Sequence, residues 1–153
     1  MENINESSIK MTKTFNVPVH LFWRAITTPE YFKEWWGPDG FTNTIHKMDV
    51  REGGICSFTM HGPDGTDFEN EYVYTKVVPL KTIVMEHQKE PRFTISITIL
   101  ANGDQTQVEW CNIFDSVPSK EEAIRAFKAD EGLQQSLSRF NEYLKRNTVF
   151  LNR

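Results

Sequence analysis

The side chains best suited to metal binding or to acid–base catalysis near neutral pH are few and scattered in this chain. There are four histidines and two cysteines: His20, His46, His61, His87, Cys56 and Cys111. No histidine pair has the i, i+4 spacing of an H-E-x-x-H helix, and the cysteines have no C-x-x-C spacing. The sequence therefore predicts no metal site and no cofactor. One alternative stays open, a site assembled in space from Cys56, His61, His87 or Cys111.

Nucleophilic and phosphate-binding fingerprints are also absent from the sequence. No G-x-S-x-G, Walker or dinucleotide-binding motif occurs. An enzyme built on this chain would need an ionisable side chain that points inward and acts as a general acid or base. The sequence offers three such candidates, which are His87, Glu71 and Asp130. If all three face solvent, the enzyme hypothesis fails.

Composition limits the classes of protein and of partner. The 153 residues suit one domain (1–153), and a hydrophobic fraction of 39% with 25% charged residues is typical of a globular chain. The formal charge of -4 and the lack of a basic cluster argue against nucleic acid as a partner. No apolar run is long enough for a membrane span. The polar, acidic start at residues 1–6 is unlike a signal peptide, so we expect a cytoplasmic protein with reduced thiols.

The amino-terminal third predicts a strand followed by two short helices. Residues 7–15 alternate loosely, as a strand does. After Pro18, apolar residues recur at i, i+3, i+4 and i+7, which predicts an amphipathic helix. Thr28-Pro29 is typical of a helix start, and the second helix is expected to end at Trp35-Trp36-Gly37-Pro38. Adjacent residues on a helix point about 100° apart, so we expect one tryptophan inside the core and the other against the rim of a cavity.

Six further strands are expected after Gly40. Alternation and turn residues place them at 41–50, 56–60, 68–78, 82–87, 93–99 and 108–114. Gly62-Pro63-Asp64-Gly65 and Asn102-Gly103 are typical hairpin turns. Strands in sequence with short turns predict an antiparallel sheet, and a sheet of about seven strands curls.

A long helix is expected over about 119–146. Ser119 and Glu122 have the spacing of a capping box. The apolar stripe slips between Phe127 and Leu133, and glycine lowers helix propensity by about 1 kcal/mol relative to alanine. We therefore predict a kink or break near Gly132. Asp130 falls at this slip and is expected to be solvated.

These elements and several motifs resemble a known family. The chain resembles homologues of the activator of the heat-shock-protein-90 ATPase, within the START-like, Bet v-allergen-like (SRPBCC) superfamily, over about residues 8–146. The resemblance rests on the segments Val17-Pro18 to Ala25, Thr28-Pro29-Glu30, Trp35-Trp36-Gly37-Pro38, Gly53-Gly54, Met60 to Gly65, and Glu131-Gly132 with Leu137 and Phe140. It implies an α+β helix-grip fold, in which a curved antiparallel sheet of about seven strands wraps a long C-terminal helix.

The resemblance leaves the function open, because the superfamily includes lipid carriers, hormone receptors, polyketide cyclases and chaperone activators. The chain is too short to include the separate chaperone-binding domain of the eukaryotic activator, which argues against chaperone activation. A chaperone cofactor would expose an apolar patch. A dimer is compatible with every alternative.

Our leading hypothesis is a protein that binds a hydrophobic or aromatic small molecule between the sheet and the C-terminal helix, without catalysis of its own. A cyclase or hydrolase that uses the same cavity is the alternative, together with a protein-interaction module. The space between a concave sheet and a single helix is a natural ligand site. The residues expected to line it are Phe32, Trp35, Trp36, Phe58, Met60, Phe93, Ile95, Ile97, Val108, Trp110, Asn112, Phe127, Leu133 and Leu137.

Overall fold

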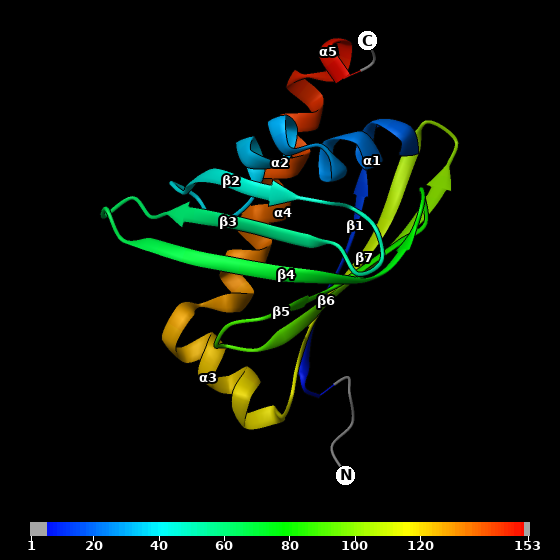
Figure 1. The fold of residues 1–153 in the computed structure, drawn as a ribbon. Coiled ribbons are helices and arrows are strands. Elements are labelled where there is room, and N and C mark those ends of the chain that lie inside the picture. Colours follow the sequence, from blue (N-terminus) through cyan, green and yellow to red (C-terminus); the bar gives the residue numbers. More distant parts are fainter. Residues whose placement is uncertain (1–5, 152–153) are drawn as a thin grey trace.

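A computed structural model describes residues 6–151 as one curved sheet crossed by a long helix (Figure 1). The first strand and the two short helices are β1 (Ser8–Phe15), α1 (Val19–Thr27) and α2 (Pro29–Trp35). Six strands follow: β2 (Thr42–Met48), β3 (Ile55–His61), β4 (Asp67–Val78), β5 (Thr82–His87), β6 (Phe93–Asn102) and β7 (Gln105–Phe114). The carboxyl-terminal helices are α3 (Val117–Phe127), α4 (Ala129–Arg146) and α5 (Thr148–Leu151). The predicted order of strands and helices is confirmed.

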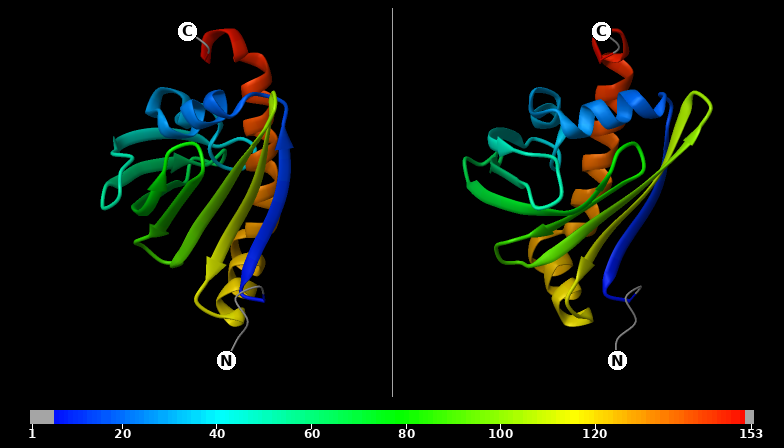
Figure 2. Two further views of the ribbon diagram at one scale, coloured as in Figure 1. Left: turned by 90° about the vertical axis from the view of Figure 1, so that its right-hand side faces the viewer. Right: turned by 45° about the vertical axis from the view of Figure 1, so that its right-hand side comes forward.

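The seven strands of residues 6–151 belong to one antiparallel sheet with the order β1-β7-β6-β5-β4-β3-β2. From β2 to β7, each strand is joined to the next by a short turn, as the alternation and the hairpin motifs predict. β1 is the exception, because it pairs with β7 from the other end of the sequence. The turned views in Figure 2 show the sheet curling around α4, with α1 and α2 closing one end of the concave face. This is the helix-grip architecture that the sequence predicts.

The break in the C-terminal helix lies at Lys128, so the prediction of a kink near Gly132 is wrong by four residues. Lys128 has a left-handed backbone (φ 51°) that ends α3 and begins α4. Gly132 is inside α4, where its amide donates to the Lys128 carbonyl. Glycine weakens a helix, but a left-handed residue ends one.

The amino-terminal cap of α3 also differs from the prediction. Ser116 is the capping residue, and its hydroxyl accepts a hydrogen bond from the Ser119 amide at 3.1 Å. Pro118 lies in the first turn, where its missing N–H costs nothing. The capping box at Ser119 and Glu122 was therefore placed three residues too late.

Both tryptophans of the pair are buried: Trp35 lies in the core, as expected of one of them, and Trp36 lies in the wall of a cavity instead of at an exposed rim. Trp35 is completely buried, stacks on Phe140 with 3.6 Å between ring centroids, and donates its indole N–H to the Ala25 carbonyl. Trp36 caps α2 in extended conformation and is only 7% exposed. Because the helix ends between them, Trp35 packs under the helices and Trp36 turns toward the concave face of the sheet.

Candidate functional site

A cavity of about 230 Å³ lies between the concave face of the sheet and the first half of α4. Its walls are mostly apolar, with aromatic rings from Trp36, which follows α2, and from β4, β6 and β7. Phe127, at the end of α3, lines the cavity and is also 60% exposed, so it stands at the mouth. The lining residues are Trp36, Gly37, Pro38, Met60, Asn70, Tyr72, Pro91, Phe93, Ile95, Trp110, Asn112, Phe114, Ala123, Phe127, Ala129, Gly132, Leu133 and Ser136.

Eight of the fourteen residues proposed from the sequence lie on this wall. They are Trp36, Met60, Phe93, Ile95, Trp110, Asn112, Phe127 and Leu133. The other six belong to the solid core instead: Phe32, Trp35, Phe58, Ile97, Val108 and Leu137. Alternation gives the face on which a side chain lies, but it does not give the part of that face that is left unfilled.

Small residues on one stripe of α4 leave the space open. Ala129, Gly132 and Ser136 recur at helical spacing and all line the cavity. A Cβ on Gly132 would already meet the Pro38 ring at 3.4 Å. This stripe of small residues is a signal in the sequence, but a search for the periodicity of large apolar residues does not detect it. A second missed signal is Asn70 and Tyr72 on β4, which alternate with the acidic side chains Glu69 and Glu71.

The polar groups of the cavity wall are neutral, and two of them have hydrogen-bonding capacity to spare. The Asn112 carbonyl oxygen accepts from the Trp110 indole N–H at 3.1 Å, and its amide nitrogen has no partner in residues 6–151. The Ser136 hydroxyl oxygen accepts from the Gly37 amide, which leaves its own O–H free to donate. Among residues 6–151, no Asp, Glu, Lys, Arg or His lines the cavity.

None of the three acid–base candidates reaches this wall. Asp130 is partly exposed in the first turn of α4, where its charge complements the helix dipole. Glu71 is partly exposed on β4. His87 is 5% exposed but lies behind the wall, with its ring against the rings of Tyr72 and Phe93.

His87 has an oxygen acceptor at each ring nitrogen. Nδ1 is 2.9 Å from the Pro91 carbonyl oxygen, and Nε2 is 3.0 Å from the Asn70 side-chain oxygen. An imidazolium can donate to both oxygens, whereas a neutral ring donates to one. Burial nevertheless lowers the pKa of His87, with Lys89 and Arg92 acting in the same direction against the hydrogen bonds.

The lowered pKa of His87 predicts acid destabilisation. The unfolded chain takes up a proton at its ordinary pKa of about 6.5, before the folded chain does. We therefore expect the protein to keep its full free energy of unfolding above about pH 7 and to lose part of it as the pH falls below about 6.5. Urea titrations across this range test it. His87→Gln should flatten the slope and exposed His46→Gln should keep it; equal slopes in all three proteins would contradict the role of His87.

The cysteines offer no thiolate for chemistry. Burial raises the pKa of Cys56 to about 11, so its thiol is neutral at physiological pH. Burial also raises the pKa of Cys111, with Glu109 adding to the effect. Residues 6–151 hold no group of three or more His, Cys, Asp or Glu side chains that could bind a metal ion.

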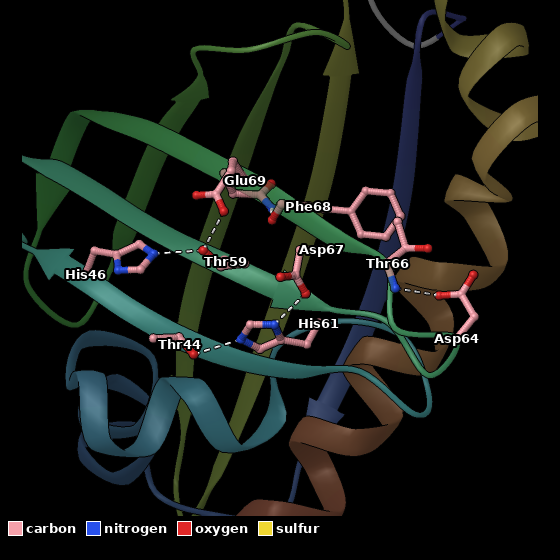
Figure 3. A network of polar contacts seen from close by, with 10 residues as sticks. Thr44, His46, Thr59, His61, Asp64, Thr66, Asp67, Phe68 and Glu69 are labelled. Atoms are coloured by element: carbon pink, nitrogen blue, oxygen red, sulfur yellow. Dashed lines mark hydrogen bonds and ion pairs between the residues drawn. The ribbon is translucent and has the colours of Figure 1, made fainter.

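A separate polar network covers the opposite face of the sheet, across β2, β3 and β4 (Figure 3). The Thr59 hydroxyl donates to Glu69 and contacts the His46 ring, both at 2.8 Å. His61 contacts Thr44 and Asp67 in the same way. This network faces away from α4 and from the cavity.

Comparison with known proteins agrees with this architecture. The family model described as "Activator of Hsp90 ATPase homolog 1-like protein" matches residues 16–145. The chain belongs to this family. A search of curated proteins finds no match. Among the helices of residues 6–151, none combines the length and apolar character that a membrane crossing requires.

Solved structures share the fold of this activator-homologue chain at low sequence identity. A Nitrosomonas europaea protein superposes with a TM-score of 0.86 at 22% identity, over 94% of this chain and 97% of its own. An Arthrobacter aurescens protein gives 0.84 at 17% identity, over 95% and 90%. An "AHSA1-like protein" from Aeromonas hydrophila gives 0.72 at 17% identity, over 91% and 94%. At these identities the likeness extends to the fold alone.

Proposed function

We propose that this protein binds a neutral aromatic molecule of one or two rings, which carries one hydrogen-bond acceptor, in the cavity between the sheet and α4. The observation that carries the proposal is a mostly apolar cavity wall in which the amide nitrogen of Asn112 has no partner among residues 6–151. Asn112 is half-buried, so its amide N–H groups stay available at the cavity wall, and an acceptor on the ligand would pair with them.

Size and charge narrow the ligand class. A volume of about 230 Å³ is below the range of about 300–1,000 Å³ usual for drug-sized ligands. It therefore favours one or two rings over a lipid chain. A carboxylate would enter a wall without any cation, and burying an unpaired charge costs more than hydrogen bonds return.

Protein interaction has weaker support in the structure. The large exposed apolar side chains of residues 6–151 are Phe68, Leu80, Leu100, Phe127 and Val149. They come from β4, the turn after it, β6, α3 and α5. Side chains scattered over five parts of the fold need no partner to explain them.

Ligand binding is tested with acetophenone and 2-naphthol as neutral probes, and with benzoate and palmitate as comparators. The neutral probes should raise the melting temperature and quench tryptophan fluorescence, since a ligand at about 100 times its Kd adds about 2.7 kcal/mol of stability. Benzoate and palmitate should do neither. A protein indifferent to both neutral probes would contradict the proposal.

A matched pair of variants locates the binding site. Gly132→Leu extends a side chain into the cavity next to Pro38, and should abolish the thermal shift caused by either neutral probe. Ala126→Leu adds the same side chain at an exposed position of α3 outside the cavity, and should leave the shift intact. Binding that survives in Gly132→Leu would place the ligand elsewhere.

A further inference from the structure

On the face of the sheet opposite the cavity, three side chains form a hydrogen-bonded chain of hydroxyl, imidazole and carboxylate (Figure 3). The Thr44 oxygen is 2.8 Å from His61 Nε2, and His61 Nδ1 is 2.7 Å from an Asp67 oxygen. We propose that Thr44, His61 and Asp67 form a nucleophilic triad that hydrolyses small carboxylic esters.

The order of the hydrogen bonds gives each residue its role. The Asp67 carboxylate only accepts, so the hydrogen of a neutral His61 ring stays on Nδ1. Nε2 is then a lone pair, and the Thr44 hydroxyl donates to it. This is the arrangement in which an imidazole removes the proton of an attacking hydroxyl while a carboxylate holds the ring.

The sheet itself builds the triad. Side chains of a strand alternate between faces, so His61 lies opposite Phe58 and Met60, which point to the core and the cavity. Pairing puts Asp67 directly beside His61 on β4. Thr44 lies on β2 and is paired with Thr59 of β3, which places it one diagonal step from His61. The His61 side chain is long enough to reach across this step.

The second histidine of this face has a different arrangement. The Thr59 hydroxyl donates to Glu69, so His46 Nε2 must donate to Thr59. No hydroxyl is activated there, because its proton already points to a carboxylate. His46 and Glu69 are therefore natural controls for His61 and Asp67.

A groove of about 330 Å³ runs along Thr44, between α2 and the edge strand β2. It is lined by Pro29, Glu30, Lys33, Asn43, Thr44 and Ile45. Lys33 and Glu30 give this groove one positive and one negative side chain, and therefore no net charge. Such a groove suits an ester without net charge.

An oxyanion donor follows from the ladder. The Gly62 amide donates to the Thr66 carbonyl across the β3–β4 hairpin. Backbone N–H groups alternate in direction along a strand, so the even-numbered amides of β3 face β4. The odd-numbered amides, including that of Thr59, therefore face β2. Thr44, opposite Thr59, is thereby paired through its backbone, and the next amide along β2, that of Ile45, points to the open edge. Thr44 and Ile45 both line the groove, so we assign this N–H as the donor to the carbonyl oxygen that gains negative charge.

The reaction consumes one water per ester. Thr44 Oγ1 attacks the carbonyl carbon as His61 Nε2 takes its proton, and the bond to the alcohol breaks as His61 returns that proton to the leaving oxygen. Water then attacks the acyl-threonine, gives a proton to Nε2, and releases the acid as Thr44 Oγ1 is protonated again. His61 is 36% and Asp67 58% exposed, so water reaches the site throughout. Hydrolysis is the acyl transfer that this exposure permits.

The test uses p-nitrophenyl acetate with the full chain near neutral pH. We expect saturable release of p-nitrophenolate and a peptide containing Thr44 that carries one acetyl group by mass spectrometry. Thr44→Val should lower the rate about 100-fold, at the lower end of what an acid–base pair contributes. Asp67→Asn should lower the rate of ester hydrolysis about tenfold or more, although this variant keeps His61.

Matched controls separate a triad from a reactive imidazole. Thr42→Val, on the same strand but opposite His61 in register, should keep the wild-type rate, as should His46→Ala and Glu69→Gln. A Thr44→Val protein that hydrolyses the ester as fast as wild type, or an acetyl group found on His61 but never on Thr44, would overturn the proposal. Melting curves check that each variant is folded. The experiment does not involve the cavity, so its outcome is independent of the proposed ligand binding.

Discussion

Replacing Trp35 with alanine is expected to lower the free energy of unfolding by about 4 kcal/mol, as is usual for a fully buried aromatic side chain. The indole has no exposed surface, stacks face to face on Phe140, and donates its N–H to the Ala25 carbonyl. Alanine would leave a cavity among α1, α2 and α4, and would leave a buried carbonyl unpaired. Urea unfolding followed by circular dichroism measures the loss.

Trp23 is the matched control for this prediction. It lies on α1 and is only partly buried at the edge of the core. Trp23→Ala should therefore cost clearly less, about 1–2 kcal/mol, because part of its side chain is already in contact with water. Equal losses in the two variants would mean that the stack on Phe140 contributes little to stability.

The alternation of apolar residues was sufficient to predict the sheet, and the reason is physical. Residues 93–99 repeat with period two because one face of β6 packs on the core and the other meets solvent. The two-residue turn at Gly103 and Asp104, one residue later than the Asn102-Gly103 signal, then fixes the β6–β7 register, which pairs Asn102 with Gln105. These signals are local, so a single sequence carries them.

The site was harder to predict because a cavity is defined by what is missing. Ile97 and Ile95 are indistinguishable by phase, yet only Ile95 borders the cavity. The difference comes from α4, where Ala129, Gly132 and Ser136 are too small to fill the space over one end of the sheet. Which strand residues lie under that stripe depends on how α4 crosses the sheet, and this is long-range information.

The polar triad on the outer face was missed for a related reason. Thr44, His61 and Asp67 come from three strands, and no spacing in the sequence connects them. The sequence predicts a hairpin turn at Gly62-Pro63-Asp64-Gly65, directly after His61, and the β3–β4 hairpin confirms it. Only the register of β2, β3 and β4 brings the hydroxyl, the imidazole and the carboxylate together.

Arg139 explains why Trp35-Trp36-Gly37-Pro38 is a fixed part of the fold, although no motif or spacing in the sequence points to this residue. Its guanidinium donates from α4 to the carbonyls of Gly37 and Pro38 at 2.7 Å, of Phe41 at 3.0 Å and of Trp36 at 3.4 Å. Gly37 needs its positive φ (99°) there, and a Cβ would meet Met60 at 2.8 Å. The backbone after Trp36 therefore has neither helix nor strand geometry, and its carbonyls lack the hydrogen bonds of regular secondary structure. The Arg139 side chain of α4 supplies hydrogen bonds to them instead.

Arg139→Met is expected to lower the free energy of unfolding by about 3 kcal/mol, because hydrogen bonds to a charged donor are worth about 1.5–3 kcal/mol each and are not additive. It should also weaken the binding of neutral aromatic probes, since Trp36, Gly37 and Pro38 line the cavity. Arg139→Lys should lose part of this stability, because one ammonium cannot match the planar spread of a guanidinium.

Arg125→Met is the control, and it removes an exposed ion pair with Glu122 from α3. Its two partners are 74% and 57% exposed, so the loss should stay within about 1 kcal/mol, and probe binding should be unchanged. Urea unfolding and probe titration of the three variants distinguish the two arginines. If Arg139→Met proved as harmless as Arg125→Met, the Trp-Gly-Pro turn would hold its shape through packing alone, and the carbonyls would be satisfied by water.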